Sequence, residues 1–143
     1  MLQQHACPCA RGPAIVSPPA LRRFQKGSGR ARMLDPKAYD WDKVPEDEPM
    51  AGVRRQIIAG DKVMLVKYHI ADGTIFPRHN HPHEQFAFIL EGTFRMETDK
   101  GTFDLGPGCV CHVPSGEFHG GRAVGDVVEV DVFSPIREDY LTS

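Results

Sequence analysis

The chain of 143 residues lacks any long apolar segment, and only 8% of its residues are aromatic. Its longest uncharged apolar stretch runs from Phe86 to Leu90, whereas a membrane-spanning helix needs about 20 apolar residues. The hydrophobic and charged fractions, 41% and 25%, are those of ordinary globular proteins. The sequence therefore predicts a single globular domain with no membrane span and no membrane partner.

Cysteine is also scarce. The four cysteines form two Cys-x-Cys pairs, Cys7/Cys9 and Cys109/Cys111. Two pairs are too few for a small domain held together by disulfides, and residues two apart on a strand rarely bridge one another. We therefore predict free thiols and a cytoplasmic location.

Acidic residues are absent from residues 1–32, which carry five Arg and one Lys. From Met33 onward, 11 basic residues face 19 acidic ones. Such an acidic body repels phosphate backbones, so we expect no nucleic-acid partner.

The first 32 residues also contain four prolines and the run Lys26-Gly27-Ser28-Gly29, without an apolar period. This composition predicts a disordered leader over 1–32 and a folded domain over 33–143. A targeting peptide and upstream sequence ahead of a working start at Met33 both fit the leader. The prolines would break the amphipathic helix of a mitochondrial presequence, which favours the second explanation.

From residue 53 onward the chain consists of short β-branched and aromatic runs separated by Gly and Pro. The only predicted helix is a short segment before them, 35–40. The predicted strands are 55–59, 62–70, 85–91, 93–98, 102–105, 109–113, 118–123 and 127–133. Strands spaced about ten residues apart predict an all-β, closed antiparallel fold, either a sandwich or a double-sheet jelly-roll β-barrel.

Five of the seven histidines lie between residues 79 and 119. His79 and His81 share a parity, so on a strand both imidazoles point to one face and can converge on one ion. His119 follows on a later strand. Imidazoles in such an arrangement suit divalent first-row transition metals.

The spacing of these histidines resembles the two motifs of the cupin superfamily. The first motif matches Gly73, His79, His81, Gln85 and Gly92, and the second matches Gly108, Pro114, Gly116 and His119. The sequence departs from the pattern twice, because Gln85 replaces an acid and Ala123 replaces an Asn. The resemblance implies a single-domain cupin, a jelly-roll β-barrel over at least residues 55–133.

In cupins the matching residues bind one metal, which implies His79, His81, Gln85 and His119 as ligands of a divalent Zn, Ni, Mn or Fe ion. Parity turns the competing Glu84 away from the histidines. The alternative is a cupin pocket without metal. Three imidazoles and an amide leave the ion's full charge in place, which favours Lewis-acid work on an oxygen-rich substrate over redox cycling.

The segment 129–141 and the run 79–85 together resemble the KdgF-type cupins, which convert 4,5-unsaturated monouronates from pectin or alginate into linear keto forms. The resemblance implies Asp131, Phe133 and Arg137 as the catalytic group. Independently, Glu129, Asp131 and Phe133 share one face of the last strand, so that face can line a cavity while the valines between them pack. A salt bridge between Asp131 and Arg137 is the structural alternative.

The function predicted on this basis is metal-dependent linearisation of a small carboxylated sugar. A metal-dependent dioxygenase and a non-catalytic sugar-binding or sensory cupin are the alternatives. The sensory alternative lacks an attached output domain in this sequence. Exposed sheet edges and the apolar arm at Tyr39 and Trp41 predict a homodimer.

Overall fold

The computed structural model describes residues 37–142, which fold into an all-β domain with no α-helix in that range. The strands are β1 (Glu46–Met50), β2 (Val53–Ala59), β3 (Met64–Ile70), β4 (Ile75–His79), β5 (Glu84–Thr98), β6 (Gly101–Leu105), β7 (Val110–Val113) and β8 (His119–Ser134). Two short 3₁₀ turns, η1 (Trp41–Lys43) and η2 (Glu138–Tyr140), flank them.

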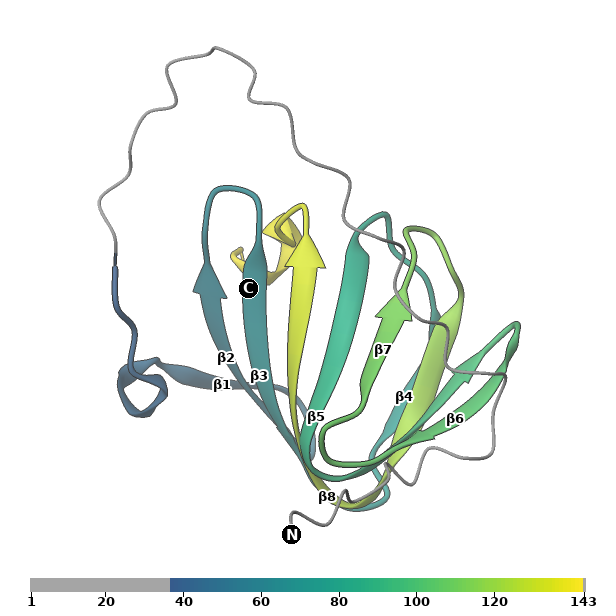
Figure 1. The fold of residues 1–143 in the computed structure, drawn as a ribbon. Helices are drawn as coiled ribbons and strands as arrows, with labels where there is room; N and C mark the ends of the chain where they lie inside the picture. Colours follow the sequence, from purple (N-terminus) through teal and green to yellow (C-terminus); the bar gives the residue numbers. More distant parts are fainter. Residues whose placement is uncertain (1–36, 143) are drawn as a thin grey trace, which may run out of the picture.

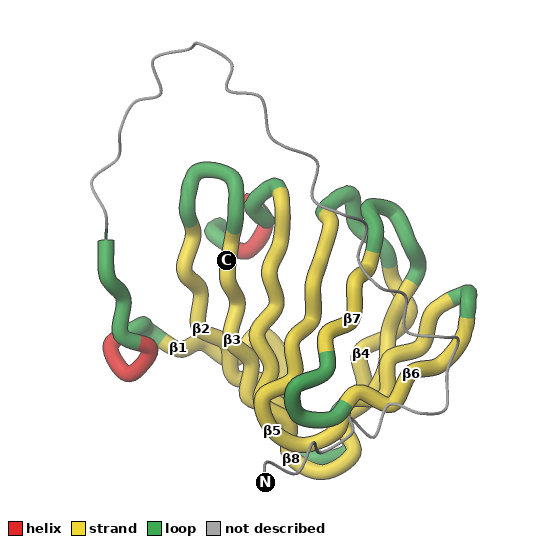
Figure 2. The backbone as a smooth tube through the Cα atoms, in the orientation of Figure 1, coloured by secondary structure: helices red, strands yellow, loops and turns green. Residues whose placement is uncertain are grey.

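Two long strands, β5 and β8, pair with each other along their whole length and bend together (Figures 1 and 2). Their ends near Glu84 and Ser134 belong to a large sheet in the order β1-β2-β3-β8-β5-β7. Their other halves join β4 and β6 in a small sheet in the order β4-β8-β5-β6. All pairs are antiparallel, so the predicted double-sheet jelly roll is confirmed.

Gly92 allows β5 and β8 to approach closely at the bend. Its φ is +76°, and a side chain there would clash with the carbonyl oxygen of Asp126 on β8. Only glycine combines this backbone conformation with such a close contact. The predicted breaks between strands 85–91 and 93–98 and between strands 118–123 and 127–133 are therefore wrong, because β5 and β8 continue through them.

The core lies between the two sheets. Alternating residues of β3 are buried, as expected for a strand with one face inward. In the small sheet, Phe76 packs edge-to-face against Phe94, and across the barrel it packs against Tyr68. These aromatic rings form an apolar wall inside the barrel.

Other local predictions differ from the structure. β1 and β4 were not predicted as strands, since each contains a proline and exposes nearly every residue. The part of the predicted 35–40 helix that is described, 37–40, is not helical, and the 3₁₀ turn begins at Trp41. The predicted leader, 1–32, lies outside the described residues, and its disorder stays a prediction, as does the boundary at 33.

The cysteine prediction is confirmed at one described position and wrong at the other. Cys111 is a free thiol, whereas Cys109 is disulfide-bonded. The argument that residues two apart on a strand do not bridge one another holds for this pair. That argument concerns only a bridge between Cys109 and Cys111 and does not exclude a bridge from Cys109 to another residue. The cytoplasmic location stays a prediction. Among residues 37–142, no helix is long and apolar enough to cross a membrane.

Candidate functional site

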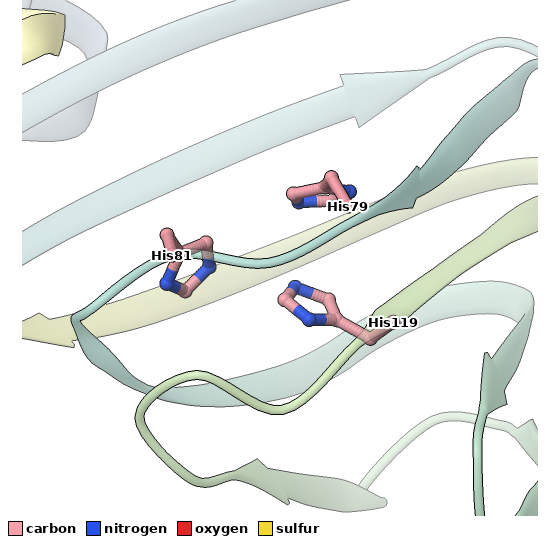
Figure 3. Close-up of side chains that lie close together, drawn as sticks. All are labelled: His79, His81 and His119. Carbon is pink, nitrogen blue, oxygen red and sulfur yellow. The ribbon is translucent and has the colours of Figure 1, made fainter.

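Three histidines predicted from the motif spacing lie close together, two of them buried and His79 exposed (Figure 3). His79 is the last residue of β4, His81 lies in the connection to β5, and His119 begins β8. The ring centroid of His119 lies 4.4 Å from that of His79 and 5.0 Å from that of His81. One ligand atom from each histidine lies within 4.8 Å of the others, so the group could hold a metal ion.

The path of the chain differs from the predicted strand through both His79 and His81. β4 ends at His79 because Pro82 follows closely, and proline neither donates to a sheet ladder nor allows the preceding residue full freedom. His79 pairs directly with His119 across β4 and β8. Sheet register, rather than simple alternation, therefore brings these rings together.

Each of the three histidines has its Nδ1 beside a backbone carbonyl two residues away. The distances are 2.8 Å from His79 to Pro77, 3.0 Å from His81 to His83 and 2.9 Å from His119 to Glu117. A carbonyl oxygen only accepts, so each Nδ1 carries the proton and donates. In the neutral rings the Nε2 atoms then keep their lone pairs, as metal-binding histidines require.

Burial keeps two of these rings neutral. It lowers the pKa of His81 from 6.5 to about 4, and the charge of Arg137 acts in the same direction. Burial also lowers the pKa of His119, which is 3% exposed. Both imidazoles are therefore unprotonated on one nitrogen at neutral pH, which is the form that binds metals.

Gln85, at the start of β5, extends the histidine group. Its amide nitrogen donates to Oδ2 of Asp131 at 2.8 Å, which directs the amide oxygen toward Nε2 of His81 at 3.1 Å. Because Nδ1 of His81 holds the proton, two lone pairs face each other at this distance. Such a contact is favourable when both atoms bind one cation, so the donor set fits a metal.

Asp131, on the C-terminal half of β8, is 4% exposed. Its Oδ1 has no hydrogen-bond partner within the described part of the chain. Burial raises the pKa of Asp131 to about 7, opposed by the Gln85 hydrogen bond and the charge of Arg137. The carboxyl group therefore exchanges a proton near neutral pH.

Phe133 and Arg137 lie beside this carboxyl group but bind other partners. The Phe133 ring is 1% exposed and packs edge-to-face against His81. Arg137 donates through Nη2 to Asp139 at 2.8 Å and stacks on the ring of Tyr140 at 4.0 Å. The alternative salt bridge between Asp131 and Arg137 is therefore wrong, because Arg137 pairs with Asp139 instead.

These side chains line one pocket. The cavity spans about 420 Å³, a volume that includes solvent at its open mouth. The lining residues are Tyr68, Phe76, His79, Gln85, Phe94, Met96, His119, Gly120, Glu129, Asp131, Phe133, Arg137 and Tyr140.

Known proteins are similar to this chain in sequence. The sequence pattern described as "Cupin domain" matches residues 66–134. The pectin degradation protein KdgF of Dickeya dadantii is 33% identical over 103 residues, which cover 70% of this chain and 94% of that protein. The chain belongs to the KdgF-type cupins.

Solved structures agree with this assignment. KdgF from Halomonas sp. superimposes with a TM-score of 0.66 at 28% identity, covering 69% of this chain and 94% of that one. An RmlC-like cupin from Shewanella frigidimarina gives 0.68 at 27% identity, covering 71% and 93%. An oxalate decarboxylase from Bacillus subtilis, 19% identical with a TM-score of 0.63 and coverages of 71% and 30%, shares the fold.

Two details of this cupin refine the sequence analysis. Glu84 points away from the histidines, as predicted, and its carboxylate binds Nε2 of His112 at 2.8 Å. Glu129, Tyr68 and Tyr140 also reach the pocket but were not predicted as site residues. The parity that Glu129 shares with Asp131 was the available signal, because it places a second acid on the inward face.

Proposed function

We propose that His79, His81, Gln85 and His119 hold one divalent transition-metal ion. The support is the common tautomer of the three rings and the orientation of the Gln85 amide, which together turn four donor atoms toward one region. A divalent ion held by these neutral donors supplies Lewis acidity toward carboxylate and hydroxyl oxygens.

We propose further that this cupin opens and ketonises 4,5-unsaturated monouronates from pectin or alginate breakdown. The relative from Dickeya dadantii, a pectin degradation protein, supports the sugar-acid class of substrate. The observation that carries the proposal is the buried carboxyl group of Asp131, joined to Gln85 by Oδ2 and with Oδ1 available to a ligand.

Asp131 moves the proton in this reaction. Its carboxylate accepts the proton of the anomeric hydroxyl while the bond between that carbon and the ring oxygen breaks. The ring oxygen, released as an enolate, takes that proton back from Asp131 to form an enol. The enol then loses its O–H proton as the adjacent alkene carbon gains one, which gives the ketone. No proton is gained or lost overall, and a carboxyl group with a pKa of about 7 suits both directions of transfer.

Arg137 and Phe133 position the substrate. The guanidinium group has five N–H donors, of which Asp139 engages those on Nε and one on Nη2. The remaining donors bind the carboxylate of the sugar acid, and the stack on Tyr140 holds the guanidinium plane in place. Phe133 packs against the sugar ring and against His81.

We propose that two copies associate through the outer face of the large sheet. Phe88 on β5 is directly opposite Val130 of β8 and Val110 of β7, and all three point outward. Phe88 and Val110 are 37% and 54% exposed. A row of exposed apolar side chains on a sheet is typical of a covered surface, and an isologous dimer covers it once on each copy.

A turnover assay with matched variants tests the enzymatic proposal. The purified protein should contain stoichiometric metal and should abolish the ultraviolet absorbance of unsaturated galacturonate. Asp131→Asn should retain the metal and lose roughly 10²- to 10⁴-fold in turnover, the usual contribution of a general acid–base group. Glu97→Gln, at an exposed position of β5, is the control and should behave as the unaltered protein.

Three results would contradict the proposal. Wild-type turnover by Asp131→Asn would remove that residue from the reaction. Oxygen consumption during turnover would identify a dioxygenase instead. Tight binding of the uronate with no change in its absorbance would identify a non-catalytic binding protein.

A further inference from the structure

The pocket contains a second buried carboxyl group, that of Glu129. Its side chain is 6% exposed, and its Oε2 has no hydrogen-bond partner among the described residues. The nearby Oδ1 of Asp131 is in the same condition. A buried polar atom without a partner is destabilising, so two such oxygens in one pocket indicate a ligand that binds both.

The place of Glu129 in the sheet brings it to the lining of the pocket. In the register, Glu129 is opposite Tyr68 on β3 and Ile89 on β5, both of them buried. Within residues 37–142, no ion pair involves Glu129. The hydroxyl of Tyr68 is already bonded to that of Tyr140 at 3.2 Å.

We propose that Glu129 is a substrate-binding residue whose Oε2, together with Oδ1 of Asp131, binds neighbouring hydroxyl groups of the sugar acid. This inference rests on the proposed function, because it assumes that a sugar acid occupies the pocket.

The two unpartnered oxygens can bind neighbouring hydroxyl groups of one sugar ring. Burial and the neighbouring charge of Asp131 raise the pKa of Glu129 well above 4.5, which favours its neutral form, a hydrogen-bond donor. One hydroxyl of the ring binds Oε2 of Glu129 and its neighbour binds Oδ1 of Asp131, and the apolar wall of Phe76 and Phe94 faces the C–H groups of the ring.

Thermal stability distinguishes a substrate-binding role of Glu129 from a role in packing. The residues around it, Tyr68 and Ile89, belong to the apolar core. A leucine of similar length would bury more apolar surface and remove an unpartnered oxygen, so Glu129→Leu should leave the melting temperature unchanged or higher. A residue kept for packing would destabilise the protein on the same change.

Calorimetric titration with D-galacturonate, which does not react, measures the effect on binding in the metal-loaded full chain. Glu129→Leu should weaken binding at least about tenfold, because the site loses a donor that the substrate hydroxyl needs. The control is Glu91→Leu, at an exposed position of β5, which should bind as the unaltered protein does. Analogues that lack one ring hydroxyl should bind the unaltered protein more weakly, whereas Glu129→Leu should not discriminate against at least one of them.

The outcomes separate the two proposals. If the unaltered protein binds no sugar acid, the proposed function fails and this inference fails with it. If the unaltered protein binds galacturonate and Glu129→Leu binds it equally well, only the role of Glu129 is overturned. Should Glu129→Leu not fold, Glu129→Met, which is unbranched like glutamate and has no hydrogen-bond donor, should still bind several-fold more weakly; unchanged binding by that variant would overturn the inference.

Discussion

The two faces of the large sheet differ unusually at β8, where acidic side chains point inward among the apolar core and valines point outward. On β8, Glu129 and Asp131 point inward and are 6% and 4% exposed. The valines between them, Val128, Val130 and Val132, point outward and are only partly buried. The alternation along this strand predicts that the valine face packs, but the more deeply buried face is the one that carries the acids.

The same inversion continues on β5. Gln85 points inward and is buried, whereas Phe86, Phe88 and Leu90 point outward and are 37–41% exposed. A buried polar group costs free energy unless it is paired, and exposed apolar side chains in a row favour association. Buried polar groups therefore gather on the inner face, where the proposed reaction would take place, and exposed apolar groups gather on the outer face, where the proposed dimer would form.

The largest effect should come from removing one imidazole from the inner face. His81→Ala should purify without metal, because the remaining donors lose the ring that faces the Gln85 oxygen. Elemental analysis measures the metal content. His112→Ala removes an outer-face histidine paired with Glu84 and should leave the metal content unchanged. Equal metal in both variants would contradict the assignment of His81.

The second largest effect should come from the bend at Gly92, where β5 and β8 approach closely and pass from the large sheet to the small one. Gly92→Ala introduces a side chain against the Asp126 carbonyl at a positive φ, so the free energy of unfolding should fall by about 3–5 kcal/mol. Gly73→Ala has a similar φ of +73° but open space around it, and should cost about 1–2 kcal/mol. Urea denaturation measures both, and similar losses would show that the close approach is unimportant.

A charge on the outer face should break the dimer and leave the inner face intact. Phe88→Glu should weaken association by about 2 kcal/mol, since a buried interface would desolvate the new carboxylate. Light scattering should then give a monomer of about 15.9 kDa. Lys62→Glu, in an exposed turn, is the control. An unaltered protein that is monomeric at micromolar concentration would remove the basis of this proposal.

The smallest effect is the pH dependence of stability, to which His81 and Asp131 on the inner face contribute with opposite sign. His81 has a folded pKa of about 4 against 6.5, so its contribution to stability is complete above pH 6.5 and is lost as pH falls toward 4. Asp131 has a folded pKa of about 7 against 3.8, so its protonation stabilises the fold as pH falls through that range. In the metal-free protein these two contributions oppose each other.

Single variants should expose the two slopes. Between pH 7 and pH 5, metal-free Asp131→Asn should lose about 1–2 kcal/mol of stability, whereas metal-free His81→Ala should gain a similar amount. Urea denaturation at the two pH values measures this difference. Parallel slopes in the two variants would show that neither group titrates as its surroundings indicate.

The sequence predicts most of the fold because alternation and turn residues act locally. β3, β6 and β7 lie close to their predicted positions. β1 and β4 could not be predicted, since the acidic segment Glu46–Met50 and the segment Ile75–His79 contain prolines and form strands only by pairing with β2 and β8. The continuity of β5 and β8 likewise depends on contacts between distant residues.

Some residues of the candidate site could likewise be predicted from the sequence, whereas others depend on contacts between distant residues. Motif spacing predicts His79, His81 and His119 together, and the structure brings them together. The partner of Arg137 could not be predicted, because stacking on Tyr140 and pairing with Asp139 arise from the 3₁₀ turn η2. The role of Glu129 depends on burial, which alternation alone does not establish when valines occupy the other parity.

The pairing of β5 with β8 also has a consequence for the order of folding. The paired residues are twenty-one apart in sequence at Thr98 and His119 and fifty apart at Glu84 and Ser134. Closing the shorter loop costs less entropy, so we expect pairing to start at the His119 end and to proceed past Gly92 toward Gln85 and Asp131. The chain would then desolvate its carboxyl groups last, after the apolar contacts of the small sheet have formed.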